Sequence, residues 1–74
     1  MSTVIDARGE NCPEPVIRVA QALQEASAGD VLQVLTDVEE CVRYIKDLVK
    51  VTGIGRVEVT EKEGHYCVVI RVTG

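Results

Sequence analysis

The sequence predicts an α/β (α+β) two-layer sandwich with the element order βαβαββ, in which both helices cover one face of a mixed four-stranded sheet. Two stretches place apolar residues at helical spacing, and the segments between and after them read as strands. The chain has 74 residues, too few for two helices to cover both faces of four strands. Right-handed crossovers then place the helices side by side. We expect residues 1–74 to form a single domain.

The first half of the chain predicts a strand over residues 3–7 and a helix over residues 15–28. The helical stripe consists of Val16, Val19, Ala20, Leu23 and Ala26. Prolines are tolerated in a first helical turn, because its N–H groups have no intrahelical partner. The residue between Pro13 and Pro15 is biased away from helical geometry, so the helix begins at either proline. Gly29 is expected to end it.

The centre of the chain predicts a second strand and a second helix. Residues 31–36 form a compact run of β-favouring side chains. Asp37 suits the N-cap of the following helix, with Glu40 three residues later as in a capping box. The apolar stripe of this helix consists of Val38, Cys41, Val42, Ile45, Leu48 and Val49. Gly53 and Gly55 are expected to end it.

The last third of the chain predicts a β-hairpin. Residues 56–62 and 65–73 both alternate between apolar and polar side chains. Glu63 and Gly64 lie between these runs and suit a tight turn. Tyr66, Val68, Ile70 and Val72 share one face of the last strand.

Composition and charge exclude several classes of function. The net charge is −4 and the aromatic residues are two tyrosines. An acidic surface repels phosphates, and the stacking side chains typical of single-strand binders are scarce, so we expect no direct contact with nucleic acid. No apolar run reaches the length of a membrane span. The first residues do not form a signal peptide, so a cytoplasmic location is expected.

The cysteines are Cys12, Cys41 and Cys67, an odd number without a C-x-x-C pair. This pattern indicates neither a disulfide-stapled secreted domain nor a structural zinc site. We therefore expect no metal and no bound cofactor.

Cys12 is the candidate reactive residue, because it lies in a polar, loop-like segment directly before the first helix. A helix N-terminus stabilises an anion through its free N–H groups and its dipole. The same effect would stabilise a thiolate, which is the nucleophilic form, or a persulfide anion. Pro13 and Pro15 stiffen the backbone on the C-terminal side of the sulfur.

The charged neighbours of Cys12 act in opposite directions. Glu10 and Glu14 favour the neutral thiol, whereas Arg8 and Arg18 favour the thiolate if they fold toward the sulfur. The sequence leaves the balance open.

The segment around Cys12 resembles the motif of the TusA/SirA family of sulfur-carrier proteins. The residues that carry the resemblance are Asp6, Ala7, Arg8, Gly9, Cys12, Pro13, Glu14, Pro15 and Val16. The resemblance extends over the whole chain, including the turn before the second strand, Asp37 after it and the final hairpin. The chain departs from the family pattern at Glu10, where leucine is usual, and in the second helix, which lacks an Asp-Ile-Pro stretch.

The resemblance implies both a fold and a function. The fold would be a two-layer sandwich like the C-terminal domain of bacterial translation initiation factor three. The function would be that of a sulfur carrier of sulfurtransferase type. Cys12 would accept sulfane sulfur as a persulfide from a donor protein, of cysteine desulfurase or rhodanese type, and relay it to an acceptor protein. The supporting motif residues would be Asp6, Arg8, Gly9, Pro13, Glu14 and Pro15.

Two other functions stay open at this point. The chain could be a non-catalytic regulatory or protein-interaction module in which Cys12 is redox-sensitive. It could also carry selenium, because the same thiolate chemistry serves both elements. We expect a monomer or a weak dimer.

The remaining candidate residues have simpler interpretations. Cys41 lies on an apolar stripe, where free cysteine is usually a buried filler; the alternative is a second thiol that resolves a Cys12 persulfide. Cys67 lies on the face of the last strand opposite Tyr66, and His65 is expected to be solvated at a turn. Asp6 could hold the Cys12 loop by bonding to nearby backbone N–H groups.

Overall fold

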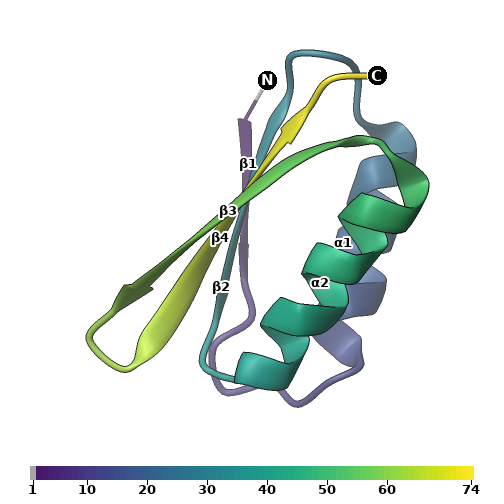
Figure 1. Ribbon diagram of the computed structural model, residues 1–74. Helices are drawn as coiled ribbons and strands as arrows, with labels where there is room; N and C mark the ends of the chain where they lie inside the picture. Colours follow the sequence, from purple (N-terminus) through teal and green to yellow (C-terminus); the bar gives the residue numbers. More distant parts are fainter. Residues whose placement is uncertain (1) are drawn as a thin grey trace.

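The computed structural model describes residues 2–74 and shows one sheet with two helices packed on one of its faces (Figure 1). The observed element order βαβαββ is the predicted one. The elements are β1 (Ser2–Asp6), α1 (Glu14–Glu25), β2 (Val31–Thr36), α2 (Glu39–Thr52), β3 (Gly55–Lys62) and β4 (His65–Val72).

The strands lie in the order β1-β2-β4-β3. The edge strand β1 runs parallel to the inner strand β2, whereas β4 runs antiparallel to both β2 and β3. The sheet is therefore mixed, and the predicted two-layer α+β fold is confirmed. None of the helices within residues 2–74 is long and apolar enough to cross a membrane.

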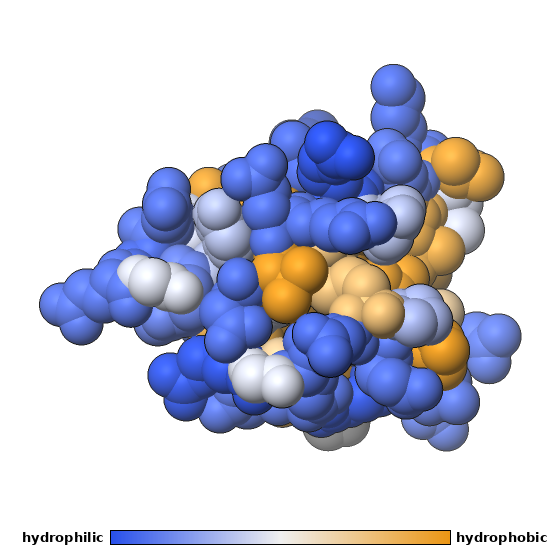
Figure 2. Space-filling model, turned by 90° about the horizontal axis from the view of Figure 1, so that it is seen from below, coloured by the Kyte–Doolittle hydropathy of each residue, from blue (hydrophilic) through white to orange (hydrophobic). Residues whose placement is uncertain are grey.

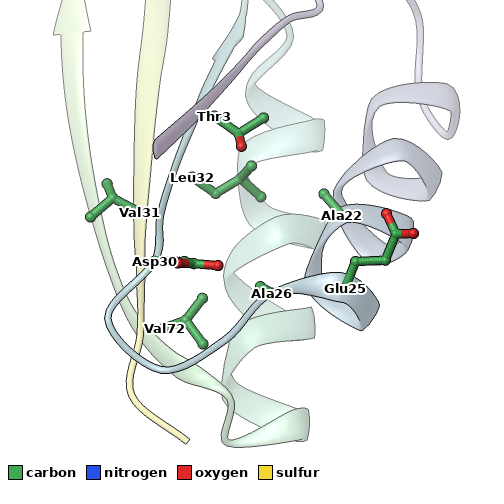
Figure 3. A pocket seen from close by; sticks show the side chains of 8 residues that line it. All are labelled: Thr3, Ala22, Glu25, Ala26, Asp30, Val31, Leu32 and Val72. Atoms are coloured by element: carbon green, nitrogen blue, oxygen red, sulfur yellow. The ribbon is translucent and has the colours of Figure 1, made fainter. Parts of the chain in front are cut away.

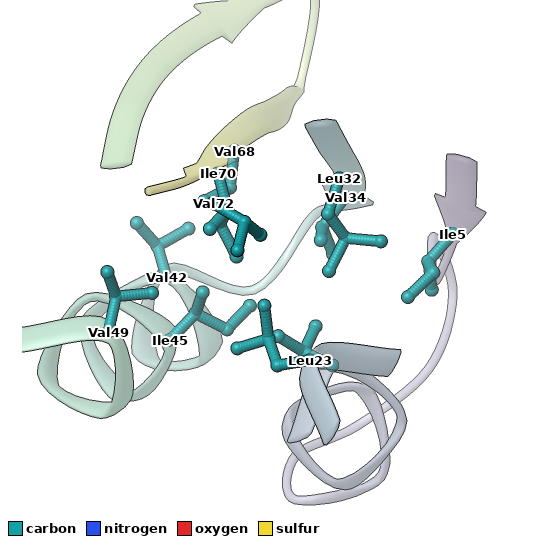
Figure 4. Packing of buried hydrophobic residues seen from close by; sticks show 11 residues of the cluster. Ile5, Leu23, Leu32, Val34, Val42, Ile45, Val49, Val68, Ile70 and Val72 are labelled. Carbon is teal, nitrogen blue, oxygen red and sulfur yellow. The ribbon is translucent and has the colours of Figure 1, made fainter. Parts of the chain in front are cut away.

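The core lies between the helices and the covered face of the sheet, and it is aliphatic (Figure 4). Ile45 of α2 and Val19 of α1 are fully buried, and both pack against the strands. The other members of the buried cluster are Ile5, Leu23, Leu32, Val34, Val42, Val49, Val68, Ile70 and Val72. Burial of these side chains fixes both helices on the sheet, because each buried aliphatic side chain contributes about 1.5–3 kcal/mol.

The first helix is shorter than predicted at its C-terminus. It ends at Glu25, and Ala26 is extended with φ −80° and ψ 150°. The Asp30 carboxylate accepts a hydrogen bond from the Ser27 N–H at 2.9 Å, and the Asp30 N–H donates to the Ser27 carbonyl. This local turn competes with the last helical turn. Gly29, with φ +95°, lies in the turn and does not cap the helix.

The start of the second helix also differs from the prediction. The N-cap is Val38, which is extended and has no side-chain cap, so the predicted capping box of Asp37 and Glu40 is wrong. The Thr36 hydroxyl accepts a hydrogen bond from the Val38 N–H at 3.2 Å. The Asp37 carboxylate instead accepts a hydrogen bond from the Gly9 N–H. The Asp37 carboxylate therefore bonds to the loop after β1 and does not cap the first turn of α2.

The end of α2 and the hairpin follow the sequence closely. Gly53 ends the helix in the left-handed conformation, with φ 64°, and its N–H donates to the Val49 carbonyl at 3.0 Å. Gly55 is already the first residue of β3. Glu63 and Gly64 both have positive φ and form the turn between β3 and β4.

Candidate functional site

The topology brings the starts of both helices to one end of the molecule. Since β1 and β2 are parallel, their C-terminal ends lie at the same edge of the sheet. A short connection leads from each strand into its helix (Figure 1). Cys12 lies in the first connection, and Cys41 is the third residue of α2. Two cysteines that are distant in the sequence are thereby placed side by side.

Cys12 and Cys41 are joined as a disulfide across the two connections. Their Cα atoms are 5.7 Å apart and 29 residues separate them in the sequence. Cys41 is fully buried, whereas Cys12 is partly buried. Cys12 is therefore less exposed than its polar sequence context suggests. Only the Cys12 end of the pair faces the surface.

Backbone hydrogen bonds hold the loop that contains Cys12. The Ala7 N–H donates to the Leu35 carbonyl at 2.7 Å, which continues the β1–β2 pairing into the loop. The Gly9 N–H donates to the Asp37 carboxylate at 3.0 Å. The Glu10 N–H donates to the Ala7 carbonyl at 3.1 Å. The loop is thus tied both to itself and to the connection before α2.

The N-terminus of α1 offers fewer hydrogen-bond donors than the sequence suggests. Pro13 and Pro15 have no N–H group. The N–H groups of Glu14 and Ile17 already donate to the carbonyls of Asn11 and Pro13, at 3.3 and 3.0 Å. The helix itself begins at Glu14, with Pro13 as its N-cap. Stabilisation of an anion on Cys12 by free helix N–H groups is therefore smaller than expected.

Asp6 and Arg8 form a compact local unit at the start of the loop. The Asp6 carboxylate accepts hydrogen bonds from the Arg8 guanidinium at 2.8 and 2.9 Å and from the Arg8 backbone N–H at 3.2 Å. These bonds lower the pKa of Asp6 to about 2, with the guanidinium as the main cause. Asp6 therefore braces the turn through one backbone N–H, in the manner predicted from the sequence.

Glu10 and Arg18 form another ion pair at the end of the molecule where both helices begin. The Arg18 guanidinium contacts both carboxylate oxygens of Glu10 at 2.7 and 2.8 Å. Both arginines considered as possible partners of the Cys12 sulfur, Arg8 and Arg18, are thus engaged by carboxylates. The charge of Glu10, which would oppose a thiolate at Cys12, is offset by Arg18.

A hollow of about 340 Å³ lies beside Cys12. Its lining consists of Asn11, Cys12, Pro13, Val38, Glu40 and Tyr44. The Tyr44 hydroxyl donates to the Glu40 carboxylate at 2.7 Å across the first turns of α2. Figure 2 shows this end of the molecule, where apolar side chains extend from the centre toward the right of the view and polar side chains lie on the other sides. An open, mixed surface of this kind suits transient contact with another protein.

Comparison with known proteins gives one consistent answer. The family model of the sulfurtransferase TusA matches residues 3–72. The chain belongs to the TusA sulfurtransferase family. The expected sulfur-carrier function is thereby confirmed at the level of the family.

Individual members of the TusA family agree with this assignment. The sulfur carrier protein TusA of Allochromatium vinosum is 33% identical over 67 residues, which cover 90% of this chain and 88% of that protein. A protein of Archaeoglobus fulgidus is 34% identical over 68 residues, covering 92% and 93% of the two chains. The crystal structure of a SirA-like protein from Desulfitobacterium hafniense superposes with a TM-score of 0.88, at 36% identity and full coverage of both chains.

Sequence reasoning missed part of the surroundings of Cys12 in this TusA-family chain. Val38, Glu40 and Tyr44 line the hollow, although they come from the second helix and its connection. Tyr44 lies outside the apolar stripe predicted for α2, and that pattern gave no sign that Cys12 lies next to it. Only the parallel pairing of β1 and β2 brings these residues together.

The third cysteine lies apart from this site. Cys67 is on the face of β4 opposite Tyr66, as predicted, and it is 5% exposed. The Gln33 side-chain amide donates to its sulfur at 3.1 Å. His65 is partly buried at the start of β4, where its charge contributes to lowering the pKa of Asp6.

A second hollow lies at the opposite end of the sheet, where β2 begins (Figure 3). It has a volume of about 230 Å³, and its polar lining side chains are Thr3, Glu25 and Asp30. The remaining lining residues are Ala22, Ala26, Val31, Leu32 and Val72. None of these lining side chains is a cysteine, whereas the hollow at the other end is lined by Cys12.

Proposed function

We propose that this protein carries sulfane sulfur as a persulfide on Cys12, accepting it from a donor protein and passing it to an acceptor protein. The observation that carries the proposal is the position of Cys12. It is the cysteine that lines the surface hollow at the end where both helices begin, in a chain of the TusA family. Cys41 and Cys67 are buried.

The proposed reaction is thiol–persulfide exchange. The Cys12 thiolate attacks the outer sulfur of a persulfide on the donor; the bond between the two donor sulfurs breaks, and the donor cysteine leaves as a thiolate. Delivery to the acceptor repeats these steps, with Cys12 as the leaving thiolate. No oxidant or cofactor is consumed, since the sulfane sulfur changes partners without changing its oxidation state.

The supporting residues fix the loop and leave the chemistry to Cys12. Pro13 and Pro15 restrict the backbone next to the sulfur. Asp6 and Arg8 brace the turn before it, and the Gly9 N–H is held by the Asp37 carboxylate. A fixed sulfur at the surface reduces the entropy lost when donor and acceptor dock. Glu14 lies in the first turn of α1 and is exposed to those partners.

The proposal includes the kind of partner and the location. A cysteine desulfurase or a rhodanese-type protein would supply the sulfur, and the protein would meet it as a monomer or a weak dimer. We place the protein in the cytoplasm, where cellular reductants keep thiols reduced and thus available for loading. Direct binding of nucleic acid is not expected, because the net charge is −4.

The test is the intact mass of the reduced protein after incubation with a cysteine desulfurase and cysteine, or with a rhodanese and thiosulfate. We expect a gain of one sulfur atom that a reductant reverses. Cys12→Ser should abolish the gain, whereas Cys67→Ser should retain it. A full gain in Cys12→Ser, or no gain with either donor in both the wild type and Cys41→Ser, would overturn the proposal.

One observation favours the alternative of a redox-sensitive interaction module. The structure joins Cys12 to Cys41 as a disulfide, which is the bond that a redox-sensitive Cys12 would form. In that alternative the disulfide itself would control partner binding, and sulfur would not be gained from any donor. The mass measurement therefore separates the two functions.

A further inference from the structure

We infer that Cys41 is a resolving thiol, which displaces the sulfur carried by Cys12 as hydrosulfide and leaves the Cys12–Cys41 disulfide. The protein would then release its sulfur in a second way, as hydrosulfide, besides transferring it to an acceptor protein. The inference rests on the proposed function, because it requires a persulfide on Cys12.

The positions of the two residues support a direct reaction. Their Cα atoms are 5.7 Å apart, within the range of about 4.4–6.8 Å that disulfides require. Cys12 lies in the connection that follows β1, and Cys41 lies in the first turn of α2, directly after the connection that follows β2. The Gly9–Asp37 hydrogen bond links these two connections. The backbone spacing at this end of the molecule therefore accommodates the bond. Such positioning gives an internal thiol a high effective concentration.

The chemistry balances without an external oxidant. The Cys41 thiolate attacks the inner sulfur of the Cys12 persulfide, and the bond between the inner and outer sulfurs breaks. The outer sulfur leaves as hydrosulfide with the electron pair of that bond. The sulfane sulfur is thus reduced to sulfide, while the two cysteine sulfurs are oxidised to a disulfide. The backbone spacing suits a bridge of two sulfurs, which selects the inner sulfur for attack.

The different exposure of Cys12 and Cys41 determines which of the two sulfurs another molecule can attack. Cys41 is 0% exposed, whereas Cys12 is partly buried and lines the hollow. Donor and acceptor proteins can therefore reach Cys12 but not Cys41. A dithiol reductant that regenerates the carrier must attack the Cys12 sulfur, with Cys41 as the leaving thiolate. The mixed disulfide formed on the way is expected on Cys12.

The structure also explains why Cys41 can serve this role without disturbing the fold. It lies in the first turn of α2, beside the buried cluster and not among its members. The neighbouring Val42 and Ile45 anchor the helix to the sheet. We therefore expect formation and reduction of the bond to change one contact beside the buried cluster and to leave both helices in place.

The experiment follows one turnover without an acceptor. The reduced wild type, Cys41→Ser, Cys12→Ser and the control Cys67→Ser are loaded anaerobically with sodium tetrasulfide, and excess reagent is removed. Intact mass and released sulfide are then measured over time. In the wild type and in Cys67→Ser, the persulfide should decay to the disulfide, with one sulfide released per chain. In Cys41→Ser the persulfide should last at least about tenfold longer.

The outcomes separate the inference from the function on which it rests. Equal persulfide lifetimes in the wild type and in Cys41→Ser, with loading on Cys12, would overturn the resolving role alone. Failure of the wild type to load would overturn the carrier function and the inference together. If Cys41→Ser does not fold, the wild type still decides: peptide mapping must find a Cys12–Cys41 disulfide formed in step with sulfide release. Sulfide release without that disulfide contradicts the inference.

Discussion

The carboxylate of Asp37 accepts a hydrogen bond from the backbone N–H of Gly9 at 3.0 Å, across 28 residues of sequence. This bond joins the loop that contains Cys12 to the connection that leads into α2 and to Cys41. It lies beside the pairing of Ala7 with Leu35, which ends the contact between β1 and β2. The spacing of the two cysteines therefore depends on one carboxylate and on the register of two strands.

Replacement of Asp37 by alanine should weaken the coupling between the two cysteines. A hydrogen bond to a charged group contributes about 1.5–3 kcal/mol. Asp37→Ala should therefore make the Cys12–Cys41 disulfide less favourable by about fivefold or more, as measured by equilibration with glutathione. Asp37→Asn keeps an oxygen acceptor and should lie close to the wild type. An unchanged equilibrium in Asp37→Ala would show that the backbone alone sets the spacing.

Truncation of Ile45 should lower the free energy of unfolding much more than truncation of Val51. Ile45 is fully buried beneath the sheet, whereas Val51 on the same helix is 85% exposed. Ile45→Ala removes packed atoms and leaves a cavity, so the free energy of unfolding should fall by about 2–5 kcal/mol. Val51→Ala should change it by less than about 0.5 kcal/mol. Urea denaturation under reducing conditions measures both; similar values would contradict the observed packing of α2.

The architecture could be predicted from the sequence because its signals are local. The stripes of α1 and α2 and the alternation of β3 and β4 repeat within a few residues, and Gly53 marks the end of α2. The errors at helix ends arise where a local signal has a competitor. The turn closed by Asp30 shortens α1, and Asp37 bonds to Gly9 instead of capping α2.

The site was predicted in part, for the same reason. Cys12 was evident from its polar, proline-flanked segment, whereas the contact with Cys41 depends on the pairing of two parallel strands. A distance between residues 29 positions apart has no local signature. The Glu10–Arg18 ion pair also joins a loop to a helix, so the charges near Cys12 could not be assigned from sequence.

A methyl group at Gly55 should destabilise the fold more than one at Gly53. A Cβ at Gly55 would overlap the backbone carbonyl of Arg71 on the neighbouring strand. At Gly53 nothing lies within 4 Å, and only the positive φ of 64° opposes alanine. Gly53→Ala should cost about 1 kcal/mol, and Gly55→Ala clearly more, since β3 must shift. Thermal denaturation should rank them in this order, and the reverse order would contradict the close approach of β3 to β4.

The Asp6–Arg8 pair should stabilise the fold at neutral pH and lose its effect in acid. The folded-state pKa of Asp6 is about 2, below its ordinary value of 3.8, because the Arg8 guanidinium and backbone N–H bond to the carboxylate. Because this pKa is lowered in the folded state, the ionised Asp6 carboxylate contributes fully to the stability of the fold above about pH 4. This stabilisation is lost as the pH falls toward 2.

Carboxyl titration by nuclear magnetic resonance tests this assignment. Arg8→Gln should return the pKa of Asp6 toward 3.8 and reduce the loss of stability between pH 4 and 2. Arg43→Gln, which removes an exposed charge from α2, should leave the Asp6 titration unchanged. An Asp6 pKa that does not respond to Arg8→Gln would show that the guanidinium is not its cause.

Removal of Arg18 should slow the reactions of Cys12. The Arg18 guanidinium offsets the negative charge of Glu10, two residues before the cysteine, at 2.7 Å. Without it, Glu10 would oppose formation of the Cys12 thiolate, although solvent screens the effect strongly at this partly exposed pair. Alkylation of Cys12 by iodoacetamide at neutral pH, in a Cys41→Ser background, should therefore be about twofold slower in Arg18→Gln.

The double variant Glu10→Gln with Arg18→Gln is the matched control, because it removes both charges and should restore the original rate. A slower rate in the double variant would indicate that Arg18 acts through packing along α1 and not through charge. An unchanged rate in Arg18→Gln would mean that solvent already screens Glu10 from the sulfur. In that case the ion pair serves only to hold the loop against the helix, and its effect should appear in the stability of the protein alone.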